Sequence, residues 1–223
     1  LPLFLLLCCT LKLWIIFMKP YEIAECLGSF PTATIYEAAG KLGDMGPEIR
    51  PIVPDVGFSA IAYTVKTFPS DTTAVIRALD NAPEGSVLVI DSGGTNRAAV
   101  WGGTSSLVCS MRGLAGCVTN GCVRDTSELL KLGVSVYAAG IAPRGTLKNH
   151  EGWCGLPISV GGISISTGDY LIGDNDGVVV VPAKNGESMC ELAREQRHKE
   201  EERDRRVRNG EALSTIIGLD EIG

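Results

Sequence analysis

The 223-residue sequence has few of the side chains that build transition-metal sites. It contains two histidines, and none of its eight cysteines stands in a Cys-x-x-Cys pair. Structural zinc sites use four such ligands at short spacings, so the sequence disfavours a zinc centre. Most of the cysteines lie in apolar or glycine-rich stretches, which is typical of small buried side chains in a reducing compartment. We therefore expect a cytoplasmic protein.

The sequence also lacks a basic patch. Lys and Arg number 20 against 26 Asp and Glu, which gives a formal net charge of -6. Nucleic-acid surfaces normally carry positive charge, so we predict no nucleic-acid partner. The charge-dense run Arg194–Arg208 mixes both signs, which is typical of a solvated helix face.

Nucleotide-binding glycine motifs are missing as well. The glycine-rich segments Asp91–Asn96 and Trp101–Ser105 match neither the spacing of a Walker loop nor that of a dinucleotide fingerprint. Both segments precede or open an expected helix, where free backbone N–H groups attract anions. A carboxylate or an enolate bound by the amides of Thr104 and Ser105 fits this position, and simple turn formation by the glycines is the alternative.

The longest apolar run, LPLFLLLCCTLKLWIIF, occupies residues 1–17. Lys12 interrupts it, it has no basic n-region and no small-residue cleavage site follows. It therefore fits neither a spanning helix of roughly 20 apolar residues nor a signal peptide. We interpret residues 1–17 as an N-terminal extension outside the native domain, with a membrane anchor as the alternative. Residues 18–223 are expected to form a single domain without membrane contact.

The rest of the chain alternates strand-like and helix-like segments. Apolar runs at Ser86–Ile90, Ala115–Thr119 and Val134–Ala138 are typical of buried parallel strands, and helices are expected between them. This alternation predicts an α/β fold of βαβ units, in which ligands gather beyond the carboxyl ends of the strands. The other expected elements are two helices within 21–42, strands at 52–56 and 58–67, helices at 72–81, 98–112 and 125–132, short strands at 156–160, 163–165, 170–173 and 178–181 that form a β-rich layer, and a C-terminal helix at about 184–209.

The segment Gly121–Asp125 places an arginine beside a carboxylate at the end of an apolar run. A guanidinium can bind a planar carboxylate through two parallel hydrogen bonds, and a carboxylate can hold a hard divalent cation. Arg124 and Asp125 together therefore suit a small oxyacid and a metal, whereas an exposed ion pair without function is the alternative.

Other polar side chains are interpreted structurally. Cys122 would be a nucleophile only if Arg124 lowered the pKa of its thiol, and no partnering base is visible nearby. Asp169, Asp174 and Asp176 stand in strand-entry and Asp-Gly turn positions, which favours turn formation over metal binding.

Four segments resemble, in order and spacing, the RraA-like family. They are DSGGTNRAAVWGG at 91–103, RGLAGCVTNGCVRD at 112–125, APRGTLK at 142–148 and TGDYLIGDNDGVVVVPA at 167–183. This family contains the divalent-metal 4-hydroxy-4-methyl-2-oxoglutarate/4-carboxy-4-hydroxy-2-oxoadipate aldolases and the regulator of ribonuclease E activity. The resemblance, which covers about residues 21–210, implies a swivelling β/β/α domain with a C-terminal helix. It also implies a homotrimer or a dimer of trimers, with sites between subunits.

The resemblance also implies roles for individual residues. By position, Arg124 would bind the pyruvyl carboxylate and stabilise the enolate oxygen, and Asp125 would hold Mg²⁺ or Mn²⁺. Glu200, in the last helix, would reach into the site of a neighbouring subunit as a further catalytic residue. The substrate-binding loop would consist of Gly102, Gly103, Thr104 and Ser105.

Gly103 departs from the pattern of the aldolases, which carry an acidic residue 21 positions before the arginine. That acid is thought to transfer protons through water, and a missing base typically lowers the rate by about 10²- to 10⁴-fold. Decarboxylation of oxaloacetate has no hydroxyl proton to remove and needs only enolate stabilisation. We therefore expect a metal-dependent lyase of 2-oxo acids, a class II pyruvate aldolase in which oxaloacetate decarboxylase activity is favoured. The alternative is a non-catalytic regulator that binds a ribonuclease.

Overall fold

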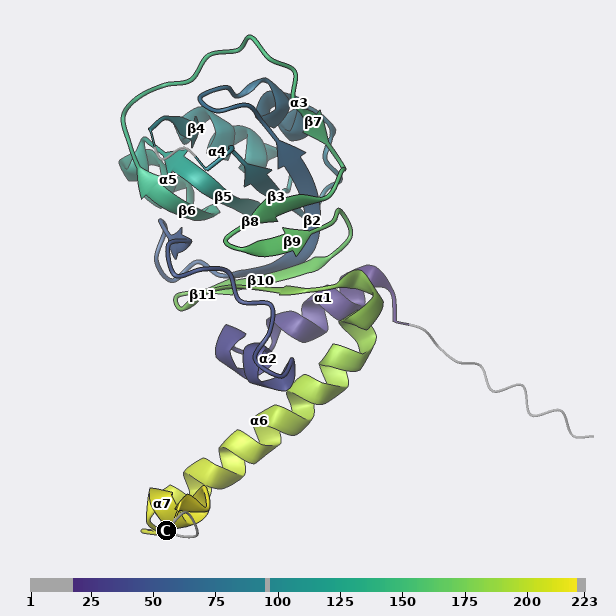
Figure 1. The fold of residues 1–223 in the computed structure, drawn as a ribbon, viewed down its shortest axis with the longest axis vertical. Helices are drawn as coiled ribbons and strands as arrows, with labels where there is room; N and C mark the ends of the chain where they lie inside the picture. Colours follow the sequence, from purple (N-terminus) through teal and green to yellow (C-terminus); the bar gives the residue numbers. More distant parts are fainter. Residues whose placement is uncertain (1–17, 95–96, 220–223) are drawn as a thin grey trace, which may run out of the picture.

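The computed structural model describes residues 18–94 and 97–219, which form an α/β fold (Figure 1). The extension expected at residues 1–17 lies outside the described residues. Four parallel strands form the centre of the sheet in the order β6-β5-β3-β2. These strands are β2 (Phe58–Lys66), β3 (Ser86–Asp91), β5 (Gly116–Val123) and β6 (Ser135–Ile141). The predicted βαβ arrangement is confirmed.

Three helices cover one face of these strands (Figure 1). They are α3 (Thr73–Asn81), α4 (Gly103–Met111) and α5 (Thr126–Leu132). Their apolar sides pack with the sheet into one core cluster that includes Val75, Leu88 and Leu129. Because the strands are parallel, the loops that enter these helices meet at one edge of the sheet, which is where ligands bind in such folds.

Short antiparallel strands extend the same sheet. β10 (Tyr170–Asp174) pairs with β2 and with β11 (Gly177–Val181), β1 (Arg50–Pro51) pairs with β6, and β7 (Trp153–Cys154) pairs with β2. A separate hairpin consists of β8 (Ile158–Val160) and β9 (Ile163–Ile165). Side chains from the hairpin, from β10 and β11 and from the central strands share a second core. The expected β-rich layer is therefore present, partly as a continuation of the main sheet.

The terminal helices pack on the other side of β10 and β11. They are α1 (Pro20–Gly28), α2 (Thr32–Ala38) and α6 (Gly186–Arg208), which form a third core with the two strands. Asp174 accepts hydrogen bonds from the backbone amide and the hydroxyl of Thr32, at 2.8 and 2.7 Å, at the first turn of α2. This explains Asp174 as a structural residue, as the sequence predicted.

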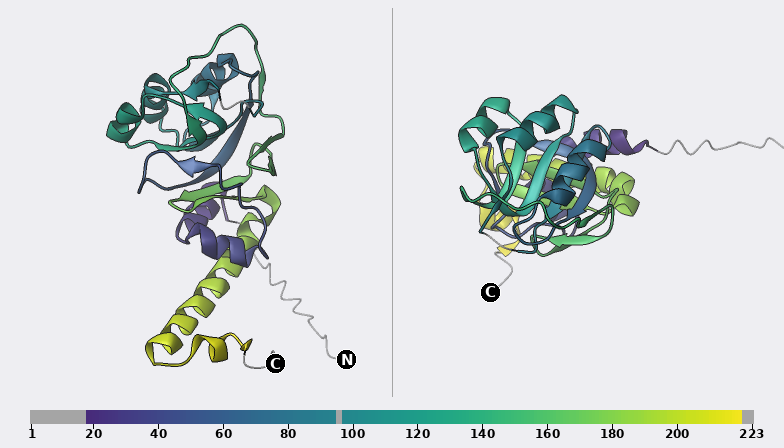
Figure 2. Two further views of the ribbon diagram at one scale, coloured as in Figure 1. Left: turned by 60° about the vertical axis from the view of Figure 1, so that its left-hand side comes forward. Right: turned by 90° about the horizontal axis from the view of Figure 1, so that it is seen from above.

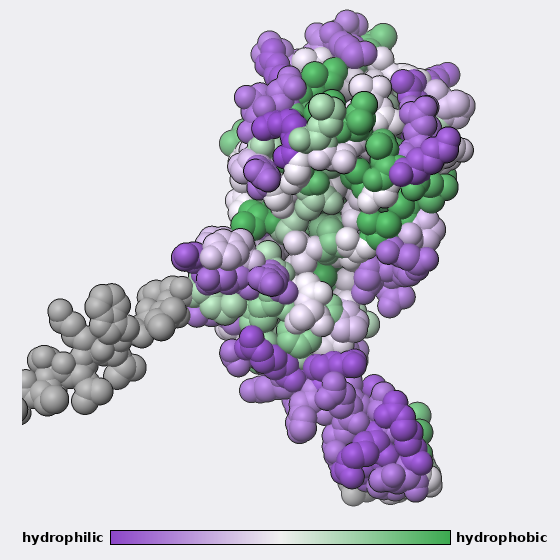
Figure 3. Space-filling model, turned by 180° about the vertical axis from the view of Figure 1, so that it is seen from behind, coloured by the Kyte–Doolittle hydropathy of each residue, from purple (hydrophilic) through white to green (hydrophobic). Residues whose placement is uncertain are grey.

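The C-terminal part of α6 projects away from the domain (Figures 1 and 2). Its surface is almost wholly hydrophilic (Figure 3). Ion pairs along the helix, such as Arg197 with Glu201 at 3.1 Å, confirm the predicted solvated face. A 3₁₀ turn, Ala183–Asn185, precedes α6, and a short helix, α7 (Leu213–Ile216), follows it.

Two predicted elements are wrong. Residues 52–56 form no strand, because Pro54 has no amide hydrogen to donate to a neighbouring strand. The pairing with β6 is confined to Arg50–Pro51 and is followed by one hydrogen bond from the Ile52 amide to the Val136 carbonyl at 2.7 Å. The helix predicted at 98–112 begins only at Gly103. The preceding Ala99–Trp101 instead forms β4, a buried strand that pairs in parallel with the end of β5.

No helix formed by residues 18–94 and 97–219 combines the length and the apolar character that crossing a membrane requires. The six cysteines in this part of the chain are free thiols. Cys122 is 2% exposed, and burial raises the pKa of its thiol. The thiol therefore lacks the lowered pKa that a nucleophilic role would need.

Candidate active site

Arg124 and Asp125 follow directly after β5, at the carboxyl edge of the parallel strands. The amide of Arg124 donates to the carbonyl of Trp101 in β4 at 3.1 Å. The pairing of β4 with β5 therefore fixes the position of the Arg124 backbone. Asp125 adopts a left-handed conformation (φ 58°, ψ 39°), which turns the chain into α5. Among non-glycine residues, Asp and Asn adopt this conformation most readily. The turn explains why a strand end can present both side chains on one side.

The two side chains form a long, exposed ion pair. Arg124 Nε lies 3.6 Å from Asp125 Oδ2, and the side chains are 47% and 41% exposed. A pair with this exposure contributes little to the stability of the fold. Both groups are thus available to a ligand.

The first turn of α4 supplies the second part of the site. The amide of Gly103 donates to Asp125 Oδ2 at 3.1 Å. The next two amides, those of Thr104 and Ser105, have no acceptor among the described residues. Unpaired amides at a helix start bind anions, because the helix dipole adds to their positive charge. The free amides therefore lie beside Arg124 and Asp125, at the position where the sequence predicts anion binding.

Gly102 allows the loop to approach the arginine and the aspartate closely. A Cβ atom at position 102 would lie 2.7 Å from Asp125 Oδ2 and 3.2 Å from Arg124 Cγ. Gly145 makes a similar approach, since a Cβ there would lie 3.1 Å from Arg124 Nη1. Any larger residue at 102 would have to displace the carboxylate.

Glu128 is a residue of this region that the sequence analysis missed. A Cβ atom at Gly103 would lie 1.8 Å from Glu128 Oε2, so the glutamate occupies the space of the absent side chain. Glu128 stands in the first turn of α5, and its amide donates to the carbonyl of Asp125 at 2.8 Å. The sequence signal that could have identified Glu128 is an acidic residue three positions after Asp125, at the start of an expected helix.

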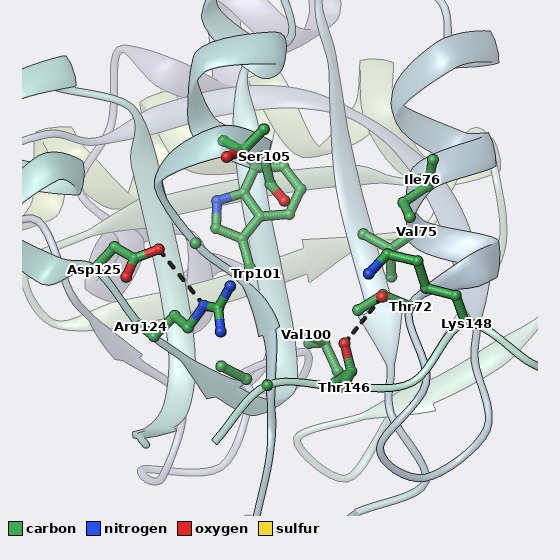
Figure 4. Close-up of a pocket in the computed structure, with 14 residues that line it drawn as sticks. Thr72, Val75, Ile76, Val100, Trp101, Ser105, Arg124, Asp125, Thr146 and Lys148 are labelled. Carbon is green, nitrogen blue, oxygen red and sulfur yellow. Dashed lines mark hydrogen bonds and ion pairs between the residues drawn. The ribbon is translucent and has the colours of Figure 1, made fainter. Parts of the chain in front are cut away.

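A cavity of about 300 Å³ opens between Arg124 and the start of α3 (Figure 4). Val75, Ile76 and Val100 give the cavity part of its apolar lining, and Val75 and Ile76 lie on the same side as Thr72 and Lys148 (Figure 4). Trp101 also lines the cavity, but it is 2% exposed and its indole donates to Ser106 Oγ at 2.7 Å. The polar side chains are Thr72, Thr104, Ser105, Arg124, Asp125, Thr146 and Lys148. Gly103 and Glu128 line a neighbouring cavity that shares Thr104.

The segment that carries Thr146 and Lys148 is fastened to the loop before α3. The buried carboxylate of Asp71 accepts hydrogen bonds from the amides of Thr73, Asn149 and His150 at 2.8, 2.7 and 3.1 Å. Burial raises the pKa of Asp71, but these amides outweigh it and lower the pKa to about 2. The segment is held by a carboxylate that stays ionised across the physiological range.

A second ionic group lies at the same edge of the sheet. Burial raises the pKa of Asp91, yet hydrogen bonds from Lys66 and Asn120 outweigh it and keep the pKa below its usual value. Lys66 comes from β2 and Asn120 from β5, so the group ties the ends of the central strands together. Its members are already paired, which indicates a structural role.

Glu200 lies outside the cavity in the isolated chain. Its Oε2 accepts a hydrogen bond from Thr34 Oγ1 at 2.8 Å, and its Oε1 accepts one from Gln196 at 3.0 Å. The side chain is 16% exposed and links α6 to α2. Its expected contribution to a neighbouring subunit's site stays a prediction.

The carboxylates beside the loop at Gly102 and Gly103 are Asp125, which lines the main cavity, and Glu128, which lines the neighbouring one. They approach the consecutive residues Gly102 and Gly103, as the distances to the two Cβ positions indicate. No group of three or more His, Cys, Asp or Glu side chains in residues 18–94 and 97–219 is placed to hold a metal ion. Mg²⁺ usually takes one or two carboxylates and completes its octahedron with water and substrate oxygens. This ligand set fits Mg²⁺ or Mn²⁺ and does not fit a closed zinc site.

Comparisons with known proteins agree with the segments noted in the sequence. The profile of the RraA-like family, described as Aldolase/RraA, matches residues 32–180. A Burkholderia multivorans protein, provisionally named 4-hydroxy-4-methyl-2-oxoglutarate aldolase, is 38% identical over 143 residues, which cover 64% of this chain and 87% of the relative.

Two solved structures resemble the fold. An uncharacterized protein from Pseudomonas syringae pv. tomato superposes with a TM-score of 0.80 at 25% identity, covering 89% of this chain and 94% of that one. The RNA-processing inhibitor RraA from Thermus thermophilis gives a TM-score of 0.63 at 26% identity, covering 68% of this chain and 92% of that one.

Proposed function

Because this chain belongs to the RraA-like family, we propose that it is a divalent-metal-dependent carbon-carbon lyase that splits 2-oxo acids through a pyruvate enolate. The observation that carries the proposal is the convergence of three groups on one cavity. These are the Arg124 guanidinium, the Asp125 carboxylate and the unpaired amides of Thr104 and Ser105. The aldolase relatives support the same reaction class.

The amides and the arginine bind and orient the substrate. The carboxylate of the 2-oxo acid accepts hydrogen bonds from the amides of Thr104 and Ser105, and Arg124 donates to the neighbouring keto oxygen. When the bond between C3 and C4 breaks, its electron pair stays on C3 and negative charge moves to that oxygen. Arg124 then stabilises the enolate more strongly than the ketone, which lowers the barrier.

Asp125 and Glu128 are the residues that would hold Mg²⁺ or Mn²⁺, directly or through water. When bound, the ion supplies Lewis acidity at the keto oxygen. The proximity of two carboxylates to the loop at Gly102 and Gly103 supports this assignment.

The two possible cleavages differ in their need for a base. In retro-aldol cleavage the C4 hydroxyl must lose its proton as it becomes a carbonyl, and C3 must then gain one to give pyruvate. In oxaloacetate decarboxylation C4 leaves as carbon dioxide, and only C3 needs a proton, which water can supply. Glu128 fills the space beside Gly103, so it is a candidate for accepting the hydroxyl proton through water. We therefore propose both activities, because Glu128 can take the place of the acid that is missing at position 103.

Assembly and location are parts of the proposal that rest on the family. A homotrimer or a dimer of trimers would bring Glu200, on the projecting helix α6, to the site of a neighbouring subunit. Free thiols in the described residues support a reducing, cytoplasmic environment.

The proposal is tested by pyruvate release from oxaloacetate by the purified full chain, with and without Mg²⁺. We expect a metal-dependent rate above the spontaneous one that falls at least a hundredfold in Arg124→Ala, the scale of removing one stabilising donor. Arg208→Ala, at the exposed end of α6, is the matched control and should keep the full rate. A rate that neither Mg²⁺ nor Arg124→Ala alters would reject the lyase.

A second function is favoured by the likeness to the RNA-processing inhibitor. As a regulator, the protein would inhibit a ribonuclease by surface contact and would not need Arg124. Two results together would support the regulator. The protein would co-purify with a ribonuclease E type endonuclease to the same extent in the wild type and in Arg124→Ala, and it would show no lyase activity.

A further inference from the structure

Two cysteines stand where the helix α1 meets the helix α6. Cys26 lies in the last turn of α1, and Cys190 lies in the second turn of α6. The two helices pack side by side (Figure 1). Cys190 belongs to the core that the terminal helices share with β10 and β11, and Cys26 packs against that core. The Cys190 thiol also donates to the carbonyl of Ile23, three residues before Cys26, at 3.9 Å. Cys190 therefore faces α1 at the level of Cys26.

Arg194 adds a cation to this pair from the next turn of α6. Residues four apart on a helix share one face, so Arg194 lies on the same side of α6 as Cys190. Its Nη2 donates to the Sγ of Cys26 at 3.4 Å. The pKa of the Arg194 guanidinium is raised, chiefly by attraction to negative charge on that sulfur. A cation beside a thiol is the setting in which cysteines react with oxidants, because the thiolate is the reactive form.

Burial gives the two thiols different properties. Cys26 is half-buried and open to solvent, whereas Cys190 is 0% exposed. Burial, and then the adjacent thiol of Cys26, raises the pKa of Cys190 to about 12. Cys190 thus stays protonated at neutral pH and is closed to an oxidant. An oxidant therefore meets Cys26 first, and Cys190 is placed to react second.

We propose that Cys26 is an oxidation site and that Cys190 is its resolving thiol, so that hydrogen peroxide converts the pair into a disulfide between α1 and α6. In a reducing compartment such a disulfide is transient, which agrees with the free thiols of the structure. The inference does not depend on the proposed lyase function, because neither cysteine lines the cavity at Arg124.

The reaction consumes one peroxide molecule and releases two water molecules. The Cys26 thiolate attacks one peroxide oxygen, so that an S–O bond forms as the O–O bond breaks, and the leaving hydroxide takes up the proton that the thiol had lost. The Cys190 sulfur then attacks the sulfur of the Cys26 sulfenic acid. The S–S bond forms as the S–O bond breaks, and the Cys190 proton leaves with the hydroxyl as the second water. Each sulfur loses one electron, and the peroxide gains two.

The other described cysteines lack one of the two requirements, which are access and a second thiol. Three of them are at most 2% exposed, namely Cys109, Cys117 and Cys122. Cys154 is half-buried like Cys26, but its thiol donates to the carbonyl of Ala74 at 3.6 Å and contacts no second thiol of the described chain. Within residues 18–94 and 97–219, an accessible thiol and a second thiol therefore meet only between α1 and α6.

The test treats the purified full chain with a small excess of hydrogen peroxide, blocks the remaining thiols with N-ethylmaleimide and maps the peptides by mass spectrometry. We expect the peptide that contains Cys26 to be joined to the peptide that contains Cys190 within one chain. Dithiothreitol should separate the two peptides again. Cys154→Ala is the matched control, because it removes a half-buried thiol outside the pair, and it should form the same link.

Single variants separate the roles of the three residues. In Cys190→Ala, Cys26 should stop at the sulfenic acid, which dimedone traps. In Cys26→Ala, Cys190 should stay reduced. Arg194→Gln should slow the oxidation of Cys26 about two- to fivefold, the scale of an exposed charge contact. Arg197→Gln, which removes an arginine paired with Glu201 instead, should leave the rate unchanged.

The wild-type link is decisive by itself, since it requires no substitution that could unfold the chain. The proposal is overturned if peroxide modifies Cys154 and leaves Cys26 reduced. It is equally overturned if Cys26 becomes a sulfinic acid without joining Cys190, or if Cys26 joins Cys8, Cys9 or a second chain instead.

Discussion

Glu128 Oε2 occupies the place that a side chain at Gly103 would take, 1.8 Å from the Cβ position. The two residues belong to different helices, α4 and α5, which pack side by side. The glycine looked like the loss of an acid when the sequence was considered alone. In the folded chain, an acid from the neighbouring helix stands in that space.

Glu128→Gln should therefore impair aldol cleavage more than decarboxylation. The amide keeps the shape but cannot accept a proton, so we expect kcat for retro-aldol cleavage to fall by about 10²- to 10⁴-fold. Oxaloacetate decarboxylation should keep most of its rate once Mg²⁺ is saturating. The measurement is the ratio of the two kcat values, with Glu187→Gln at the start of α6 as the control.

A relocated acid provides the complementary experiment. Gly103→Asp alone crowds Glu128, whereas Gly103→Asp combined with Glu128→Ala places one carboxylate in the same space. The double variant should recover aldol cleavage relative to Glu128→Ala. If the double variant folds but cleaves the aldol substrate no faster than Glu128→Ala, an acid at this place has no part in proton transfer.

Gly102→Ala tests the close approach of the loop to Asp125. The added Cβ would lie 2.7 Å from Asp125 Oδ2, so the carboxylate must move away from the amide of Gly103. We expect Mg²⁺ affinity to fall about tenfold or more, since displaced ligands weaken metal sites to this degree. Isothermal titration with Mg²⁺ measures it. Gly85→Ala strains a left-handed backbone position (φ 77°) without meeting a neighbouring atom, so it controls for general loss of stability. Unchanged Mg²⁺ binding in Gly102→Ala would argue against Asp125 as a ligand.

The parts of the site that are local in sequence could be predicted, and the parts made by tertiary contacts could not. The place of Arg124 and Asp125 at a strand end follows from the apolar run before them, whereas the helix predicted at 98–112 put Thr104 and Ser105 in its interior and not in the first turn that they form. The Asp71 carboxylate accepts a hydrogen bond from the amide of Asn149, which lies 78 positions further along the sequence, and no local sequence pattern predicts that bond. The helix predicted at 98–112 included Trp101, whereas pairing with β5 decides its conformation.

Asp71→Asn should destabilise the protein in a pH-dependent way. The folded-state pKa of Asp71 is about 2, below its ordinary value of 3.8. The stabilisation is therefore complete above about pH 4 and is lost as the pH falls through about 2. At pH 7 we expect the variant to lose about 2 kcal/mol, the scale of hydrogen bonds to a charged group. Thermal unfolding of both proteins from pH 2 to 7 checks this, and a Tm difference that stays constant down to pH 2 would contradict it.

Glu200→Gln and Thr34→Val together separate two roles of the C-terminal helix. Within one chain, Glu200 accepts a hydrogen bond from Thr34 at 2.8 Å, so either substitution should weaken the contact between α6 and α2 by about 1 kcal/mol. Only Glu200→Gln removes the carboxylate that a neighbouring subunit's site would use. If Glu200 acts across subunits, Glu200→Gln lowers kcat at least tenfold while Thr34→Val does not, and light scattering shows an unchanged oligomer for both. If the two variants instead lower kcat equally and only slightly, the role of Glu200 is limited to holding α6 against α2, because the carboxylate then contributes nothing beyond its hydrogen bond to Thr34.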